Sequence, residues 1–164
     1  MASVGGTRVE VMCGDWRRTG CAAVVNSAND SLVHGGGIAA SIAEVAGDGY
    51  RSHCLFVVES KGGQIRRGSA VYTPPGGAKQ FGLSAILQAV VPNLAGAAPT
   101  DVDKAVFLAA VHAALDCTPT ECRSVALPCL GAGIFGWSPG DAAGLIVAGV
   151  SQWVDLHPGV LEKV

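Results

Sequence analysis

Short apolar runs alternate along the chain with segments of helical spacing, and turns rich in glycine, proline and asparagine separate them. The runs 21–25 and 85–91 are apolar throughout, which is typical of strands covered on both faces of a sheet. Pro92 ends the second of them, and Pro74 ends a strand pattern that begins at Ser69. Five segments therefore predict strands, namely 9–13, 21–25, 69–73, 85–91 and 125–127.

Three segments predict helices with recognisable ends. Residues 38–46 carry apolar positions at helical spacing, and Gly47 ends that pattern. Thr100 caps a helix that continues towards Cys117, and we expect its inner face to be formed by Val102, Ala105, Val106, Ala109, Ala110 and Ala113. Ser138, Pro139 and Asp141 open a last helix, which extends to about Trp153.

Because strands alternate with helices, the pattern predicts an α/β fold of three layers, α/β/α, around a central mixed and mostly parallel sheet. The sequence contains no internal repeat and no low-complexity linker, so we expect a single domain over residues 1–164. Residues 92–99 are expected to form a surface loop.

Composition narrows the class of protein. Hydrophobic residues make up 49% of the chain and charged residues 15%, which excludes intrinsic disorder. The net charge of −2 argues against a nucleic-acid footprint over the whole domain, and we interpret Arg17-Arg18 and Arg66-Arg67 as solvated loop features. No apolar run is long enough for a membrane span, and the first residues lack the pattern of a signal peptide.

Six cysteines occur without a C-x-x-C pair or a zinc-binding spacing. We interpret them as reduced, buried thiols of a cytoplasmic protein, and we expect neither a metal site nor a cofactor. The 23 glycines suggest instead that backbone approaches another element or a ligand closely.

Two segments share one order of features: a buried strand, then a turn or loop with glycines, then a helix. They are residues 24–37 and 125–136. Ligands of α/β sheets bind beyond the carboxyl ends of the strands, and exposed N–H groups of glycine loops suit a diphosphate there. The chain lacks the lysine motif of nucleotide triphosphate hydrolases and the full glycine fingerprint of dinucleotide-binding folds.

These loops resemble the signature loops of the macro domain family. Val25–Asn29, followed by 32–39, is similar to the first loop, and 130–136 is similar to the second. Residues 13–16 resemble the family's Gly-Asp-Ile segment. The match spans nearly the whole chain, and the sequence of 34–37 is most similar to viral polyprotein domains and their hydrolase relatives. That similarity implies a viral non-structural protein in the host cytoplasm.

The resemblance implies a site for ADP-ribose. Asp15 matches the carboxylate that accepts a hydrogen bond from the adenine amino group, and Trp16 takes the neighbouring backbone contact. Asn29 matches the amide that holds the distal ribose. The remaining positions form the walls around the diphosphate and distal ribose, namely Gly35, Gly36, Gly37, Ile38, Ala132, Gly133, Ile134, Phe135 and Gly136.

The resemblance also implies catalysis by Asn29 and His34. Beside a glycine triplet, His34 is not expected to be an ordinary core histidine, and in similar hydrolases it helps to orient the terminal ribose. A water held by the ligand's own diphosphate would attack, and the two residues would act by orientation. His34 as a general base is the less favoured alternative, and His53, His112 and His157 are interpreted as structural or exposed.

The function implied is removal of mono-ADP-ribose from acidic side chains of modified proteins by a monomeric enzyme. Three alternatives remain within the family: a reader that binds ADP-ribose without turnover, an O-acetyl-ADP-ribose deacetylase, and a domain for poly-ADP-ribose or RNA. An unrelated α/β phosphate-binding protein is the fourth.

Four features depart from the family pattern. Gly131 stands where serine or threonine is frequent, and no Gln-Glu-Glu sequence follows the glycine loop, which disfavours cleavage between ribose units. Lys61 and Lys79 lie outside the matched loops, so catalysis by lysine is unsupported. The chain also ends soon after the last helix, so a final strand near the adenine is expected to be short or absent.

Overall fold

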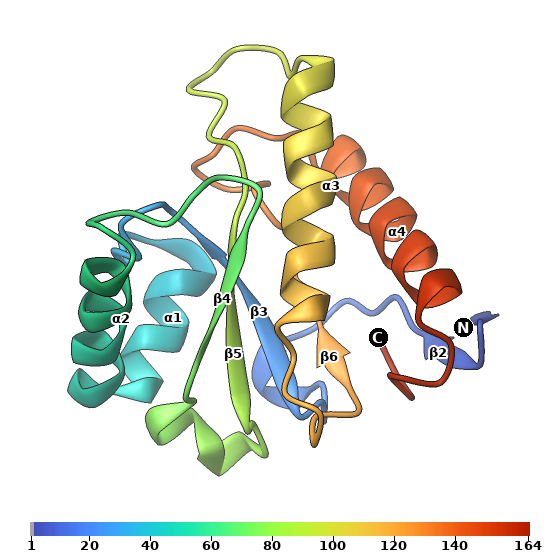
Figure 1. Cartoon of the computed structure of the whole chain (residues 1–164), viewed down its shortest axis with the longest axis horizontal. Helices are drawn as coiled ribbons and strands as arrows, with labels where there is room; N and C mark the ends of the chain where they lie inside the picture. The colour runs from blue at the N-terminus through green and yellow to red at the C-terminus, as the bar shows by residue number, and fades with distance from the viewer. Residues whose placement is uncertain (1) are drawn as a thin grey trace.

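A mixed sheet lies at the centre of the computed structural model, which describes residues 2–164 (Figure 1). Its strands follow the order β4-β5-β3-β6, and their bounds are Ala70–Thr73, Ala85–Val90, Ala23–Ala28 and Val125–Ala126. β3 runs parallel to both β5 and β6, whereas β4 is antiparallel to β5. The parallel strands therefore have their carboxyl ends at one edge of the sheet.

Two pairs of helices cover the two faces of this sheet. α1 (Gly37–Ala46) and α2 (Asp48–Ser60) lie on one side, and α3 (Asp101–Asp116) and α4 (Pro139–Leu156) on the other (Figure 1). Val24 belongs to the core under α1 and α2, whereas its neighbour Val25 belongs to the core under α3 and α4. Successive side chains of a strand point to opposite faces, so a strand buried twice is apolar throughout.

A small antiparallel hairpin, β1 (Ala2–Val4) and β2 (Thr7–Val9), precedes the central sheet. The last residues of the chain connect this hairpin with the central sheet. Lys163 pairs in parallel with Arg8 on one side and with Ser124 on the other. The Val125 N–H donates to the Lys163 carbonyl at 3.1 Å, and the Val164 N–H donates to the Arg8 carbonyl at 2.9 Å. Residues 162–164 thus contribute one short stretch of extended pairing.

The three-layer α/β fold with a mixed, mostly parallel sheet is confirmed. The caps are confirmed too: Thr100 and Asp103 form a capping box at α3, and the Ser138 hydroxyl accepts the Asp141 N–H at α4. The predicted strand 9–13 is wrong beyond Val9, because residues 10–13 leave the ladder. β1 and α2 were not predicted, and two 3-10 helices, η1 (Trp16–Arg18) and η2 (Gly76–Phe81), add to the pattern.

The inner face predicted for α3 is also wrong in part. Val102 is 71% exposed, whereas Phe107, Val111 and Leu115 are buried. The alanines are spread around this helix and give little contrast, so the large side chains that pack on the sheet and on α4 decide its orientation. Gly149 of α4 approaches Val111 so closely that a Cβ on it would lie 2.9 Å from Val111 Cγ1.

The cysteines divide into two groups. Cys21, Cys54 and Cys122 are buried as predicted and Cys117 is half-buried, but Cys13 and Cys129 are exposed, which corrects the prediction for these two. Between residues 2 and 164 all six are free, and no group of side chains there could hold a metal ion.

No helix in the same range is both long and apolar enough to cross a membrane.

Candidate functional site

The two glycine loops meet at the carboxyl edge of the sheet. β3 and β6 are neighbouring parallel strands, so the loops that follow them begin side by side. The Gly131 N–H in the second loop donates to the Ser27 hydroxyl oxygen at the end of β3, at 3.0 Å. This bond fixes one loop against the other, as the shared order of features predicts. Ser27 itself was not predicted.

Asn29 organises the first loop through its side-chain amide. Its Oδ1 accepts hydrogen bonds from the Val33 N–H at 2.9 Å and from the Ser31 hydroxyl at 3.1 Å, and its Nδ2 donates to the Val33 carbonyl at 2.9 Å. Leu32 takes the left-handed conformation of this turn, with φ of 51°. Because a primary amide has two N–H groups, one N–H of Asn29 remains for a ligand.

The start of α1 has backbone N–H groups that no side chain caps and that an anion could bind. Gly36 occupies the N-cap position, no side chain caps it, and the first turn contains no acidic residue. The first N–H groups of a helix lack partners within the helix and carry partial positive charge. A Cβ at Gly35, Gly36 or Gly37 would meet nothing within 4 Å, so the space beside this backbone is open.

The second loop is held from behind by an aromatic side chain. Gly131 has φ of +71°, and a Cβ there would lie 2.5 Å from Cδ1 of Trp137. The Trp137 indole N–H donates to the Pro92 carbonyl at 2.8 Å, and the Leu94 N–H donates to the Phe135 carbonyl at 2.9 Å. The departure at Gly131 therefore has a local cause. Residues 92–99 form the predicted, largely exposed surface loop, and Pro92 and Leu94 of that loop also support the second glycine loop.

A hollow of about 260 Å³ lies between the two loops. The structure brings seven of the predicted site residues together in its wall besides Asn29, namely Gly35, Gly36, Gly37, Ile38, Gly133, Ile134 and Phe135. Ala132 and Gly136 belong to the same loop but do not line the hollow. Ser27, Pro128 and Cys129 line it without having been predicted.

A second hollow of about 560 Å³ adjoins the first and contains Asp15 and Trp16. Ile38, Pro128 and Cys129 border both hollows, so the two hollows adjoin, and together they are called the groove below. Trp16 is fixed by a bond from its indole N–H to the Ser41 hydroxyl at 3.0 Å. Its ring also packs edge-on against Phe81 at 5.8 Å. An aromatic wall and a carboxylate thus stand at one end of the groove, and the glycine loops at the other.

Asp15 is already engaged by its neighbour. The Arg17 Nε donates to both carboxylate oxygens of Asp15, at 2.9 and 3.0 Å, and the Arg17 N–H donates to Oδ1 at 2.9 Å. These hydrogen bonds lower the pKa of the Asp15 carboxyl to about 2. Asp15 stays ionised at neutral pH, and Arg17 Nη2 donates a fourth hydrogen bond, to Oδ2, so a donor arriving in the groove would have to share this carboxylate with Arg17.

His34 is the predicted site residue that the structure places apart from the groove. It lies between Val33 and Gly35, yet neither hollow includes its side chain. Its ring stacks on that of Tyr50, with 5.1 Å between centroids and 29° between planes. Burial and the nearby Arg51 cation lower the pKa of His34, so the ring is neutral at pH 7. The expectation that it would not pack like a core histidine is corrected, and its catalytic role stays a prediction.

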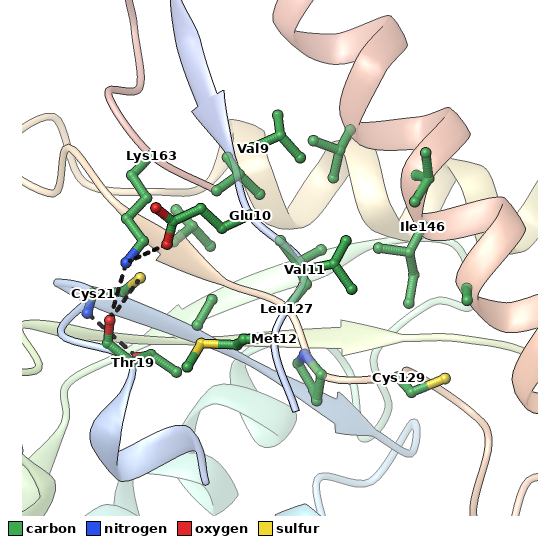
Figure 2. Close-up of a pocket in the computed structure, with 17 residues that line it drawn as sticks. Val9, Glu10, Val11, Met12, Thr19, Cys21, Leu127, Cys129, Ile146 and Lys163 are labelled. Carbon is green, nitrogen blue, oxygen red and sulfur yellow. Dashed lines mark hydrogen bonds and ion pairs between the residues drawn. The ribbon is translucent and has the colours of Figure 1, made fainter. Parts of the chain in front are cut away.

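A third hollow of about 260 Å³ lies on the α4 side of β6 (Figure 2). It adjoins the groove at Met12, Thr19 and residues 126–129. Val9, Val11, Leu127 and Ile146 give it a mostly apolar wall. At its edge Lys163 Nζ lies 3.2 Å from Glu10 Oε2 and donates to the Thr19 carbonyl at 3.2 Å. No glycine loop enters this wall, so it offers no comparable cradle for a phosphate.

Pro128 and Cys129 border all three hollows and were missed by the sequence analysis. The signal that points to them is their position directly after β6, because ligands of such sheets lie at the carboxyl ends of the strands. Ser27 carries a weaker signal, since it is one polar position within a buried strand.

Comparison with known proteins decides the family. A family model described as Macro domain matches residues 25–146, which is more than half of the chain and includes both glycine loops. The chain belongs to the macro domain family.

The relatives of this macro domain come from several organisms. An uncharacterized protein of Thermotoga maritima is 28% identical over 160 residues, which cover 97% of this chain and 26% of that protein. The macro domain therefore spans about a quarter of the Thermotoga protein. A Salmonella typhimurium protein named O-acetyl-ADP-ribose deacetylase is 28% identical over 148 residues, covering 90% of this chain and 80% of the relative.

Among solved structures, the Oceanobacillus iheyensis macrodomain with ADP superposes with a TM-score of 0.86 at 22% identity. The match covers 99% of this macro domain and 85% of the other chain. At that identity the likeness concerns the fold, and it agrees with the three layers and strand order described above. The expected viral source, cytoplasmic location and monomeric state stay predictions.

Proposed function

We propose that this macro domain binds ADP-ribose and hydrolyses mono-ADP-ribose from acidic side chains of modified proteins. The observation that carries the proposal is the groove of two adjoining hollows, with a carboxylate and an indole at one end and two glycine loops at the other. These features match in order an adenine, a diphosphate and a distal ribose. The solved Oceanobacillus iheyensis macrodomain with ADP supports the same ligand class.

Each part of the groove has a chemical task in this proposal. Asp15 accepts the adenine amino hydrogen, and Trp16 forms the adjoining wall. The uncapped start of α1 and the backbone of 133–136 hold the diphosphate charge without a basic side chain. The free N–H of Asn29 donates to a hydroxyl of the distal ribose, and Phe135 closes the wall beside it.

The reaction adds one water to the bond between the ribose and the carboxylate of the modified protein. Water, positioned by the ligand's diphosphate, attacks either the anomeric carbon or the ester carbonyl. Attack at the anomeric carbon breaks its bond to the ester oxygen, whereas attack at the carbonyl breaks the bond between the acyl carbon and that oxygen. Either way the products are ADP-ribose and a free carboxylic acid, which releases its proton to solvent. Asn29 contributes by orienting the ribose, so the effect is one of geometry.

The test measures release of free ADP-ribose from a protein mono-ADP-ribosylated on glutamate. We expect release by the wild type and a loss of at least about 100-fold in Asn29→Ala, because the distal ribose loses its orientation. Asn93→Ala is the matched control, since this exposed asparagine also accepts a backbone N–H, that of Ala95, but does not line the groove. No release at high enzyme concentration, together with binding of ADP-ribose, would identify a reader module instead.

A second candidate function is deacetylation of O-acetyl-ADP-ribose, which the name of the Salmonella relatives supports. It uses the same groove and also hydrolyses an ester on the distal ribose. Acetate release from O-acetyl-ADP-ribose, without release of ADP-ribose from the modified protein, would favour this activity over the first.

A further inference from the structure

His34 stands at the junction between the first glycine loop and the interior. Its ring stacks on Tyr50, which is only 2% exposed. Both ring nitrogens are shielded from solvent, and neither finds a hydrogen-bond partner among residues 2–164. A ring in this position contacts the core with its face and turns neither nitrogen to the groove.

Tyr50 is itself fixed by a buried polar network. The Gln88 Nε2 donates to the Tyr50 hydroxyl oxygen at 2.7 Å and to Thr73 Oγ1 at 2.9 Å. The Asn26 Nδ2 donates to Gln88 Oε1 at 2.8 Å. Gln88, Thr73 and Asn26 come from β5, β4 and β3 and are all buried. Moving Tyr50 would break hydrogen bonds that water cannot replace there, so the network gives His34 a rigid platform.

The loop beside His34 has no comparable support of its own. Gly35, Gly36 and Gly37 have no side chains to pack, and the space at each Cβ position is empty. Glycine also has the largest backbone freedom to lose on ordering. The loop is therefore held by the first turn of α1 on one side. On the other side it is held by the Asn29 side chain, which bonds both backbone groups of Val33, and by the stacked ring of His34.

We propose that His34 is a positioning residue: its neutral ring, stacked on Tyr50, holds the glycine loop in the shape that receives the diphosphate. It acts through planarity and packing, and it neither transfers a proton nor bonds the ligand. The neutral state of the ring agrees with this role, because burial and Arg51 lower its pKa. The inference deepens the proposed function, since the loop concerned is the one assigned to the diphosphate.

Three substitutions of His34 distinguish a packing role of its ring from a chemical role of its nitrogens. His34→Phe keeps a planar ring but no nitrogen, whereas His34→Leu fills similar volume without a stack, and His34→Ala removes both. We expect the Phe variant to retain ADP-ribose affinity and ADP-ribose release within about threefold, with an unchanged pH profile between about pH 6 and 8. Its melting temperature is expected to equal or exceed that of the wild type, because two unpaired buried nitrogens are removed.

The Leu and Ala variants are expected to bind ADP-ribose about tenfold more weakly, because the competent loop becomes a minor state. Their affinity for AMP should remain at the wild-type level, since the end of the groove with Asp15 and Trp16 is untouched. General destabilisation of the protein would weaken the binding of ADP-ribose and of AMP alike. If His34→Ala fails to fold, the Leu variant carries the same comparison.

Loss of release in His34→Phe with normal ADP-ribose affinity would overturn the proposal, because it would show that a ring nitrogen takes part in the reaction. Normal ADP-ribose affinity in both the Leu and Ala variants would overturn it as well. Amide hydrogen exchange at residues 35–38 provides a readout without ligand, and we expect faster exchange in Leu and Ala than in Phe. If the wild type binds no ADP-ribose, the proposed function fails, while the exchange comparison still decides the role of His34.

Discussion

Gly131 is the position where a single missing side chain matters most in the second loop. Its backbone has φ of +71°, and the ring of Trp137 occupies the place of a Cβ. Its N–H also carries the bond to Ser27 that joins the two loops. Serine or threonine at this position would displace Trp137, which explains why this chain departs from the more frequent family residues.

Gly131→Ala is therefore expected to lower the free energy of unfolding by about 2 to 4 kcal/mol, through backbone strain and overpacking together. Urea denaturation measures the change. The matched control is Gly144→Ala in the exposed part of α4, where nothing lies within 4 Å of a Cβ. That substitution should leave stability unchanged or raise it by about 0.5 to 1 kcal/mol. Equal effects of the two changes would contradict the role of Trp137.

At the scale of elements, the two helices that follow the glycine loops begin differently. α4 is closed by Ser138, whose hydroxyl accepts the Asp141 N–H at 3.0 Å and donates to the Asp141 carboxylate at 2.7 Å. α1 begins at glycine with no side-chain cap. The Ser138 cap satisfies one of the free N–H groups at the start of α4, whereas no side chain satisfies any at the start of α1. This difference supports the proposed place of the diphosphate at α1.

Ser138→Ala is expected to lower the free energy of unfolding by about 1 kcal/mol, because the start of α4 loses its cap. Ser52→Ala, on the exposed side of α2, is the control and should change stability by less than about 0.5 kcal/mol. Thermal or urea unfolding of both variants measures the difference. Unchanged stability in Ser138→Ala would mean that solvent replaces the cap.

Elements with strong local signals were predicted well from sequence. β5 is almost entirely apolar, and a capping residue or a proline marks an end of α3 and of β5. α2 was missed because its apolar residues, among them Leu55 and Phe56, are partly exposed and blur the helical period. The hairpin of β1 and β2 was missed because each strand has only three residues.

For the whole molecule, residues 162–164 connect the hairpin with the central sheet. Their backbone exchanges hydrogen bonds with Arg8 and Glu10 on one side and with Arg123 and Val125 on the other. The Glu10 carboxylate adds an ion pair with Lys163 at 3.2 Å. The N-terminal hairpin and the C-terminal residues 162–164 thus lie side by side at one edge of the molecule (Figure 1).

Removal of residues 162–164 is expected to lower the free energy of unfolding by about 3 kcal/mol or more, since several backbone hydrogen bonds are lost at about 1 kcal/mol each. Lys163→Ala keeps the backbone bonds and removes the ion pair with Glu10 and the hydrogen bond to the Thr19 carbonyl, so it should cost about 1 kcal/mol, less than the truncation. Urea titration compares the two. A truncated protein as stable as Lys163→Ala would show that the pairing adds nothing.

The sequence by itself determined the α/β class, the caps of α3 and α4 and the two glycine loops, because strand and helix periods and cap chemistry act within a few residues of the chain. It also placed Asn29 and the Phe135 loop in one site, since parallel neighbouring strands bring their carboxyl ends together. Only the tertiary structure decided that His34 faces Tyr50, that Trp137 requires glycine at position 131 and that Pro128 and Cys129 border the groove. These outcomes depend on which side chains meet across distant segments, and no local pattern encodes that contact.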